Sequence, residues 1–497
     1  MRTRIRGSWV VGNDNGSHCL IKNGEVIYEN DTILFVGRDF EGDVHTDIDA
    51  AGKLVCPGFI DTHVHAGYQA QKRMITDVGR PDYFGQPFLE FDVGRAGTVV
   101  GGDPRFFSEE DKLLHKGDPW AMFTAVELLR NGVTTFVEMG APVHMQEALA
   151  NAVTRVGTRA YLGAGYDLGG WVGGPGGRLT RAIDVEAGAA AFKSAVAFSK
   201  RIDGTSEGRV KAILAPRRVE TCSLEQLSET AELSRELGFP VCIHAAYNVH
   251  EFYDVVREHQ RTPIELLDDV GLLDLGPKLN IGHGNFVSDH RRLAYSGGKD
   301  IELMGRHGAT ISHCSCNLVR RARFLDTWSK YRKAGVNISL GSDTYPRDMV
   351  MQMRTASYFG KVLEHDLSAA SAAEVFEAAT LNGAKSLGRS DIGRLAAGAK
   401  ADIIAIDIQN MRFGPVRDPI KSLVECGMGD DVTTVIVGGK ICMQDRRIAG
   451  VDIEALLSAG QEVGERTWTN WQNWDTLGRT ADQMCPMSFP LLEGGGC

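Results

Sequence analysis

Five residues in this chain have the types and positions expected of metal ligands. They are His63 and His65 in PGFIDTHVHAG, His244 in FPVCIHAAY, His283 in KLNIGHGNF and Asp343 in VNISLGSDTYP. Each comes at the end of an apolar segment that predicts a buried strand, and barrel enzymes keep their catalytic residues where strands give way to loops. The set indicates a metal site, and a metal-dependent hydrolase is the first hypothesis.

Two of the histidines are spaced to share one ion. In a strand, residues i and i+2 point to the same side, so His63 and His65 can both face a barrel interior. A single H-x-H pair is common by chance, but this one follows Pro57 and Gly58 and is joined by further histidines at two later strand ends. The alternative, core histidines bonded to backbone carbonyls, explains one such residue more easily than the whole set.

The ligand types narrow the metal and the chemistry. Imidazole nitrogen and carboxylate oxygen favour zinc or iron over magnesium or calcium. We expect zinc first, with iron, cobalt or manganese as alternatives. Such an ion lowers the pKa of a bound water from about 16 to near 7, which predicts hydrolysis. Asp343 can contact the metal and move the proton of the attacking water. His283 either completes the metal shell or polarises the electrophilic group of the substrate.

Residues 58–395 alternate strand-like and amphipathic helix-like segments, which is typical of a parallel α/β fold. Eight strand-like segments repeat over this region, and the predicted architecture is a (β/α)8 TIM-like barrel. The segments are VCPGFIDTHVH, GVTTFVEMG, TRAYLGAGY, RVKAILAP, PVCIHAAY, LNIGHGNF, GATISHC and NISLGSD.

The two ends of the chain predict smaller units. Residues 1–57 and 396–450 consist of short apolar strands separated by glycine turns, and together they predict one composite β-sandwich. Residues 451–497 predict a helical extension. Its tryptophans at 468, 471 and 474 form one helical stripe that packs on the barrel or on a second subunit.

Two insertions interrupt the predicted barrel. Residues 66 to about 115 include the aromatic residues Tyr68, Tyr83, Phe84, Phe88 and Phe91 and are too long for an ordinary loop, so we interpret them as a lid or substrate wall, with an oligomer contact as the alternative. Residues 163–178 begin with G-x-G, but the third glycine of a dinucleotide motif is out of place. We expect a flexible loop that presents Trp171.

Composition excludes several classes of partner. The net charge of the 497 residues is −10, and the one basic cluster, Arg320, Arg321 and Arg323, is short, so neither nucleic acid nor an anionic membrane is expected. No apolar stretch is long enough for a membrane span or an export signal. The ten cysteines lack the regular spacings of a disulfide framework and are expected to be reduced thiols. The prediction is a cytoplasmic enzyme with a small-molecule substrate.

The order of the motifs resembles the amidohydrolase superfamily. H-x-H follows PGFID, two separate histidines come next, and the aspartate of GSD precedes a β segment that contains GRLAAGAKADIIAID. The resemblance extends over residues 20–450. It is strongest to the group of triazine chlorohydrolases and aminohydrolases, guanine and cytosine deaminases, and phenylurea and thiocarbamate hydrolases.

The resemblance implies a set of ligands and an assembly. It implies a single divalent metal and a homo-oligomer, with His283 beside the metal. Lys211 is the alternative, as a carboxylated lysine bridging two metals, but its segment is similar to the ILAP strand of the one-metal group. The implied ligands are His63, His65, His244 and Asp343.

The chain departs from this group at the fifth predicted strand. Deaminases there carry H-x-x-E, whose glutamate protonates a ring nitrogen, whereas this chain has Tyr247 three residues after His244. Tyrosine has a reference pKa near 10 and is a poor proton donor at neutral pH. Glu251 lies four residues further, about 6 Å along a helix, so it does not simply replace the missing glutamate.

Two further departures concern substrate contacts. Arg217 stands where relatives usually have histidine. Its guanidinium group can donate hydrogen bonds to a substrate oxygen or form a salt bridge with Glu220. His313 lies in SHCSCN, which lacks the usual proline, and it is either a residue near the substrate or a structural one. The predicted substrate contacts are Arg217, Tyr247, Glu251, Trp171 and His313.

These departures favour one reaction over another. Without the H-x-x-E glutamate, cleavage of a non-peptide carbon-nitrogen bond in an aromatic or heterocyclic amide, urea or carbamate is the main hypothesis. The alternative is a deaminase or chlorohydrolase of an N-heterocycle, with Tyr247 or Glu251 replacing the glutamate. An inactive scaffold is disfavoured, because all five ligand positions are filled.

Overall fold

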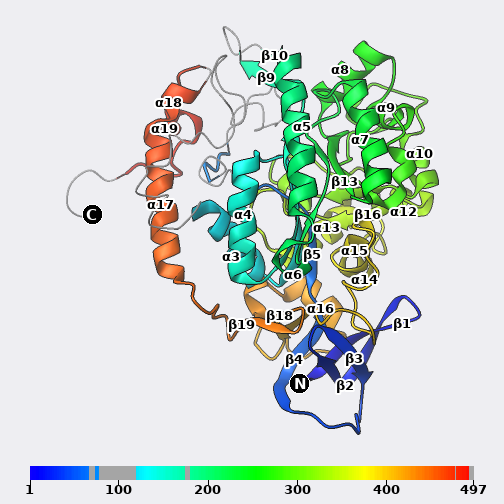
Figure 1. Ribbon diagram of the computed structural model, residues 1–497, viewed down its shortest axis with the longest axis vertical. Helices are drawn as coiled ribbons and strands as arrows, with labels where there is room; N and C mark the ends of the chain where they lie inside the picture. Colours follow the sequence, from blue (N-terminus) through cyan, green and yellow to red (C-terminus); the bar gives the residue numbers. More distant parts are fainter. Residues whose placement is uncertain (67–72, 78–118, 174–178, 476, 492–497) are drawn as a thin grey trace.

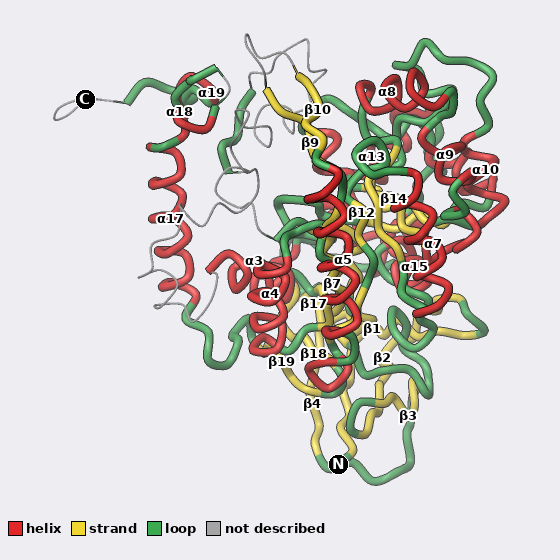
Figure 2. The backbone as a smooth tube through the Cα atoms, turned by 45° about the horizontal axis from the view of Figure 1, so that its top comes forward, coloured by secondary structure: helices red, strands yellow, loops and turns green. Residues whose placement is uncertain are grey.

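The computed structural model describes residues 1–66, 73–77, 119–173, 179–475 and 477–491 (Figure 1). Most of the predicted lid, including Tyr68, Tyr83, Phe84, Phe88 and Phe91, lies outside the described residues. A unit of β-strands contains the N-terminus, and a larger α/β body adjoins it (Figures 1 and 2). Among the described residues, no helix combines the length and the apolar character needed to cross a membrane.

All eight predicted strands of the α/β body are present. Two parallel four-stranded sheets have the orders β11-β7-β6-β5 and β13-β14-β15-β16, and parallel bridges from Leu214 to Val241 and from Val64 to Asp343 join them at both edges. The strands therefore follow one another in a ring with their carboxyl ends together. Their bounds are β5 (Phe59–Val64), β6 (Val133–Met139), β7 (Arg159–Gly163), β11 (Val210–Ala212), β13 (Val241–Ala245), β14 (Leu279–His283), β15 (Thr310–His313) and β16 (Asn337–Leu340).

Amphipathic helices lie around these strands and bury their apolar faces against them (Figure 2). Several begin with side-chain caps: Ser223 caps α7 and Asn248 caps α8, each in a reciprocal capping box. The helices are α3 (Pro119–Arg130), α4 (Val143–Val156), α5 (Val185–Ile202), α6 (Thr205–Gly208), α7 (Leu224–Leu237), α8 (Val249–His259), α9 (Pro263–Asp269), α10 (Asp300–His307), α11 (Ser315–Val319), α12 (Trp328–Ala334), α13 (Met349–Glu364), α14 (Ala372–Ala378), α15 (Leu381–Ser386) and α16 (Pro419–Cys426).

Residues 163–178 and their flanks are more regular than predicted. Short strands β8 (Gly165–Tyr166) and β12 (Ala215–Pro216) pair in parallel. Strands β9 (Gly169–Gly173) and β10 (Leu179–Ile183) form an antiparallel hairpin in which Trp171 pairs with Arg181. The prediction of a flexible loop around Trp171 was therefore wrong, because backbone pairing with a segment beyond the glycines organises it.

A polar network fills the centre of the strand ring. The Thr62 hydroxyl lies 2.7 Å from the Ser312 hydroxyl and 2.8 Å from the Ser339 hydroxyl. Asn280 donates to the Thr62 carbonyl at 2.9 Å and accepts from Ser312 at 2.8 Å. These buried groups satisfy one another and connect β5, β14, β15 and β16 beneath the ligand-bearing strand ends.

Strands from both ends of the chain pair in one sheet. The order is β19-β18-β17-β4-β1-β2-β3, whereas a sandwich implies two packed sheets. Strand β4 is long enough to pair with β1 along most of its length and with β17 at its end, which makes the sheet continuous. The bounds are β1 (Arg2–Asp14), β2 (Ser17–Glu29), β3 (Thr32–Gly37), β4 (Thr46–Pro57), β17 (Ile403–Asp407), β18 (Val432–Val437) and β19 (Lys440–Gln444).

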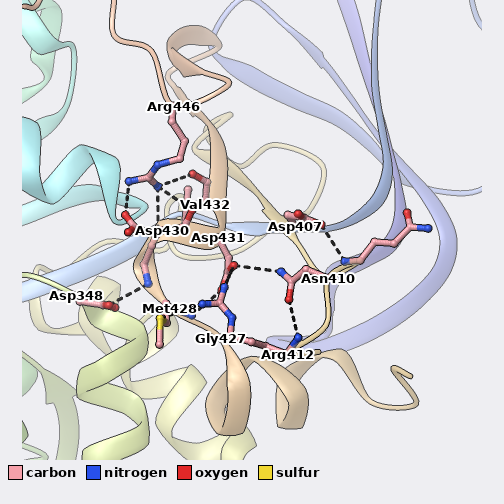
Figure 3. Close-up of polar contacts among 12 residues, drawn as sticks. Asp348, Asp407, Asn410, Arg412, Gly427, Met428, Asp430, Asp431, Val432 and Arg446 are labelled. Carbon is pink, nitrogen blue, oxygen red and sulfur yellow. Dashed lines mark hydrogen bonds and ion pairs between the residues drawn. The ribbon is translucent and has the colours of Figure 1, made fainter. Parts of the chain in front are cut away.

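Polar contacts attach this sheet to the α/β body. Figure 3 shows that Arg446 binds Asp430 and the carbonyl of Val432, and that Asp348 accepts a hydrogen bond from the Gly429 amide at 2.9 Å. Asp348 also caps α13 through two backbone amides. The strand β18 is thereby tied to the helix that follows Asp343.

The described residues after β19 form three helices. They are α17 (Ile453–Thr469), α18 (Trp471–Trp474) and α19 (Ala481–Met484). Trp471 is buried in a small apolar cluster with Met74 and Met484, and partly buried Trp468 packs against the same cluster, so two tryptophans of the predicted stripe pack on this chain. The side chain at 474 lies outside the described residues.

A buried ion pair also joins the sheet to the α/β body. Arg159 at the start of β7 donates to Asp402 through Nε at 2.7 Å and Nη2 at 3.0 Å. Asp402→Asn leaves the arginine without its counter-charge and should cost about 3–5 kcal/mol of unfolding free energy, measured by urea denaturation. Glu207→Gln, which breaks an exposed pair with Lys440, is the control and should leave the midpoint nearly unchanged. Equal shifts for both variants would contradict this role.

Candidate metal centre

The structure brings the five predicted ligands together at the carboxyl ends of the strands. His63 and His65 come from the end of β5, His244 from β13, His283 from β14, and Asp343 from the turn after β16. Two triads, His63 with His65 and His244, and His63 with His283 and Asp343, each offer ligand atoms within 4.8 Å of one another. His63 belongs to both, so one ion can draw on the whole cluster.

Distances within the cluster suit a single small cation. His65 Nε2 lies 3.2 Å from His244 Nε2 and 3.6 Å from Asp343 Oδ1, while His283 Nε2 lies 3.9 Å from Asp343 Oδ2. The His65 and His244 rings are nearly parallel, with centroids 5.2 Å apart. Nitrogen and oxygen donors gathered this closely match the shell that zinc takes from histidine and aspartate.

The histidines are in the form that binds metal. His244 Nδ1 lies 2.7 Å from the backbone carbonyl oxygen of Arg217, which fixes the proton on Nδ1 and leaves the Nε2 lone pair for an ion. Burial, and then the neighbouring imidazoles, hold the pKa of His244 well below its usual value. Burial lowers the pKa of His283 to about 3, against the opposing charge of Asp343. Both rings are therefore neutral at neutral pH.

Backbone pairing at the ring closure positions three ligands. The His65 amide donates to the Asp343 carbonyl and the Asp343 amide to the His63 carbonyl, both at 2.7 Å. Asp343 and His283 have φ of 61° and 74°, in the left-handed region that non-glycine residues rarely adopt. Such conformations cost roughly 1–3 kcal/mol and cluster at functional sites, where surrounding contacts enforce them.

Two glycines allow His63 to reach the centre. A Cβ on Gly341 would lie 2.6 Å from the His63 Cβ, and one on Gly282 would lie 2.6 Å from His63 Cε1. Real side chains do not tolerate these distances, so β14 and the turn after β16 need glycine where they flank the histidine.

Sequence analysis missed two residues that hold the ligands. Asn317, in the short helix α11 after β15, donates to the Asp343 carboxylate through Nδ2 and accepts from Arg320 at 2.8 Å. Arg347, whose side chain is fully buried, donates to the His65 carbonyl at 2.8 Å. The asparagine of SHCSCN was a visible signal, whereas nothing near Arg347 in the sequence indicates that it contacts His65.

Two of the predicted substrate-contacting residues, Arg217 and His313, make contacts within the protein. Arg217 Nε donates to the Gly140 carbonyl at 3.1 Å, and its own carbonyl orients His244. His313 packs edge-on against Trp328 with ring centroids 6.1 Å apart, while its neighbour Ser312 faces the central network. Strand alternation thus directs His313 toward the helices, and its contact with substrate stays a prediction.

Glu251 has a structural role in this site. Its carboxylate accepts from the amides of Ala246 at 2.7 Å, Tyr247 at 3.0 Å and Asn248 at 3.4 Å. These bonds hold the turn between β13 and α8. The start of α8 thus uses this carboxylate, and a contact between Glu251 and substrate stays a prediction.

The alternative two-metal arrangement gains no support from Lys211. Its ammonium lies 3.6 Å from Asp203 Oδ2, and it belongs to neither triad of candidate ligands among the described residues. The geometry of the described residues therefore supports one metal ion rather than two.

Comparison with known proteins identifies the family. The amidohydrolase family profile matches residues 54–442, which include all five ligands. The chain belongs to the amidohydrolase family. It is therefore a metal-dependent enzyme that acts on carbon-nitrogen bonds other than peptide bonds, as predicted from the sequence.

Curated relatives resemble the chain over nearly its whole length. It is 32% identical over 465 residues to a 5-methylthioadenosine/S-adenosylhomocysteine deaminase of Pyrococcus abyssi, covering 92% of this chain and 98% of that protein. It is 29% identical over 453 residues to a 5'-deoxyadenosine deaminase of Methanosarcina barkeri, covering 90% and 94%.

Solved structures share the fold. An adenosine deaminase from Xanthomonas campestris with bound zinc has a TM-score of 0.75 at 21% identity, covering 93% of this chain and 98% of that one. Atrazine chlorohydrolase from Arthrobacter aurescens TC1, complexed with zinc, has a TM-score of 0.74 at 20% identity, covering 93% and 100%. Zinc in these neighbours agrees with the divalent metal predicted from the donor set.

Gly341→Ala tests the geometry around His63. The added methyl group displaces the histidine, so the zinc dissociation constant should rise about 10–100-fold while the fold is retained. Metal content after equilibration with chelator-buffered zinc measures this change. Gly460→Ala in α17, where the new methyl meets its nearest atoms at 3.7 Å, is the matched control. Unchanged zinc affinity in Gly341→Ala would contradict the argument.

Proposed function

We propose that this enzyme is a zinc-dependent deaminase that hydrolyses the exocyclic carbon-nitrogen bond of an amino-substituted N-heterocycle, with adenosine derivatives modified at the 5' position as the first substrates to test. The observation that carries the proposal is the match to the Pyrococcus abyssi deaminase, which extends over 98% of that protein. The complete set of buried ligands supports an active site of the same kind.

The residues around the ligands support a hydrolytic step. When bound, zinc supplies a Lewis acid and a water whose pKa falls from about 16 to near 7. Asp343 takes a proton from the attacking water and delivers it to the departing amino group, which leaves as ammonia. Asn317 holds the Asp343 carboxylate, and His283 lies beside it to contact the water or the substrate.

The architecture proposed for this function is a (β/α)8 barrel. The ring of eight strands would be residues 58–395, the strands of both chain ends would form the composite β domain, and residues 451–497 would form the extension. Substrate would enter at the carboxyl ends of the strands, where the ligands lie. Cytoplasmic location and homo-oligomer formation stay predictions.

A second candidate is cleavage of an exocyclic amide, urea or carbamate. The observation that favours it is Tyr247 in the place of the H-x-x-E glutamate, because release of an amine from such a group needs no proton on a ring nitrogen. The deaminase explains the relatives better, provided that another residue supplies that proton.

The released product separates the two candidates. Zinc-loaded enzyme should release one ammonia for each molecule of 5'-deoxyadenosine or 5'-methylthioadenosine converted, measured by coupled ammonia assay and by the change in purine absorbance. Anilides and phenylureas should release no amine. Amine release from those compounds, without ammonia from any aminoheterocycle, would contradict the deaminase.

Asp343→Asn tests the proton transfer. The amide keeps a neutral oxygen ligand but accepts no proton, so kcat should fall about 100–10,000-fold. Zinc content, measured by elemental analysis, shows whether the metal is retained. Turnover within tenfold of wild type, with zinc bound, would show that Asp343 does not move the proton.

A further inference from the structure

Tyr247 stands in the place of the missing glutamate, and its side chain contacts a different glutamate, Glu220. Its hydroxyl donates to Glu220 Oε1 at 2.5 Å. The Trp171 indole Nε1 donates to the same oxygen at 3.2 Å, from the hairpin of β9 and β10. The tyrosine ring itself lies beside the metal ligands, with its centroid 6.0 Å from His244 and 6.3 Å from His283.

Glu220 follows β12, in a segment that lies beside the end of β13. Arg218 forms a parallel bridge with His244, and the Val219 amide donates to the His244 carbonyl at 3.1 Å. Glu220 follows at once, so its backbone lies at the same edge of the strand ring as the ligands. A carboxyl group thus arrives beside β13 from the loop after β12 rather than from β13 itself.

The two oxygens of Glu220 differ in their contacts. The residue is 5% exposed, and Oε1 accepts from Tyr247 and Trp171. Among the described residues, buried Oε2 has no hydrogen-bond partner. A buried carboxyl oxygen without a partner is costly in a structural role but suits an atom that exchanges a proton with a ligand.

We propose that Glu220 is the general acid of this site, donating a proton from Oε2 to the ring nitrogen of the substrate, and that Tyr247 and Trp171 are positioning residues that orient its carboxyl group. This inference rests on the proposed deaminase function and names the group that the missing H-x-x-E glutamate would have supplied.

The surroundings keep a proton available. Burial raises the pKa of Glu220, although the charge of Arg218 and the bond from Tyr247 oppose the shift. Glu251, the other buried carboxyl nearby, has its pKa raised by burial and then by the charge of Glu220. Arg181 is a further charged group that interacts with Glu220. Two buried carboxyl groups whose charges act on each other do not both ionise readily, which favours a proton on one of them.

The proton balance closes over one turnover. The O–H bond of Glu220 breaks, its electron pair stays on the carboxylate, and the proton forms an N–H bond on the ring. Water forms the new C–O bond and gives one proton to Asp343. The C–N bond then breaks with its electron pair on nitrogen, which takes the proton from Asp343 and leaves as ammonia. The remaining hydroxyl proton returns to Glu220.

Glu220→Gln tests the proposal on the zinc-loaded enzyme. It should lower kcat about 100–10,000-fold with zinc content unchanged. In wild type, kcat/KM should fall as pH rises through the pKa of Glu220, because the acid must be protonated, and this limb should be absent from the variant. Tyr247→Phe should lower kcat by roughly tenfold and shift the limb, since it removes one donor to Oε1. Glu229→Gln, an exposed glutamate on α7, is the matched control.

A second measurement does not depend on turnover. In metal-free protein, infrared difference spectra recorded across pH should contain the C=O band of a protonated carboxyl group that Glu220→Gln removes. A Glu220→Gln enzyme that stays folded, keeps kcat within tenfold and retains the wild-type pH limb would overturn the proposal while the deaminase stands. If wild type releases no ammonia from any aminoheterocycle, the deaminase fails, and this proposal fails with it.

Discussion

The site depends on bringing His63 into the centre of the strand ring. This histidine belongs to both ligand triads, and the glycines at 282 and 341 leave no room for a side chain of their own beside it. The pair of backbone hydrogen bonds between β5 and the turn after β16 closes the ring at the same point. The same backbone contacts therefore close the ring and place the ligands. They hold Asp343 in the left-handed region of φ, which is energetically unfavourable for a non-glycine residue.

Each of several contacts around the metal ligands holds one ligand in position. A backbone carbonyl fixes the tautomer of His244, Asn317 holds the Asp343 carboxylate, and buried Arg347 holds the backbone of His65. The network around Thr62 supports the strands from below. Preorganised ligands of this kind need little rearrangement when an ion binds, which is the usual contribution of such supporting contacts to metal affinity.

The sequence alone could predict the strands and ligands, because a local pattern of residues determines them. Short apolar segments that alternate with amphipathic ones indicated all eight strands, and strand-terminal histidines indicated the ligands. It could not predict contacts set by tertiary pairing. The hairpin around Trp171 needs a partner beyond a glycine-rich segment, and the single sheet needs β4 to pair on both sides. The orientation of His313 depends on which face of β15 meets the central network, and the capping role of Glu251 depends on where α8 begins. Glu220 is the clearest case, because nothing in its segment shows that the β12 loop passes beside β13.

The central claim is that one divalent ion is held by the residues gathered around His63. Anomalous X-ray diffraction from zinc-loaded crystals, recorded on both sides of the zinc absorption edge, tests it directly. The account predicts a single peak at bonding distance from His63, His65, His244 and Asp343. A peak elsewhere, or a second peak bridged to the first through Lys211, would contradict it.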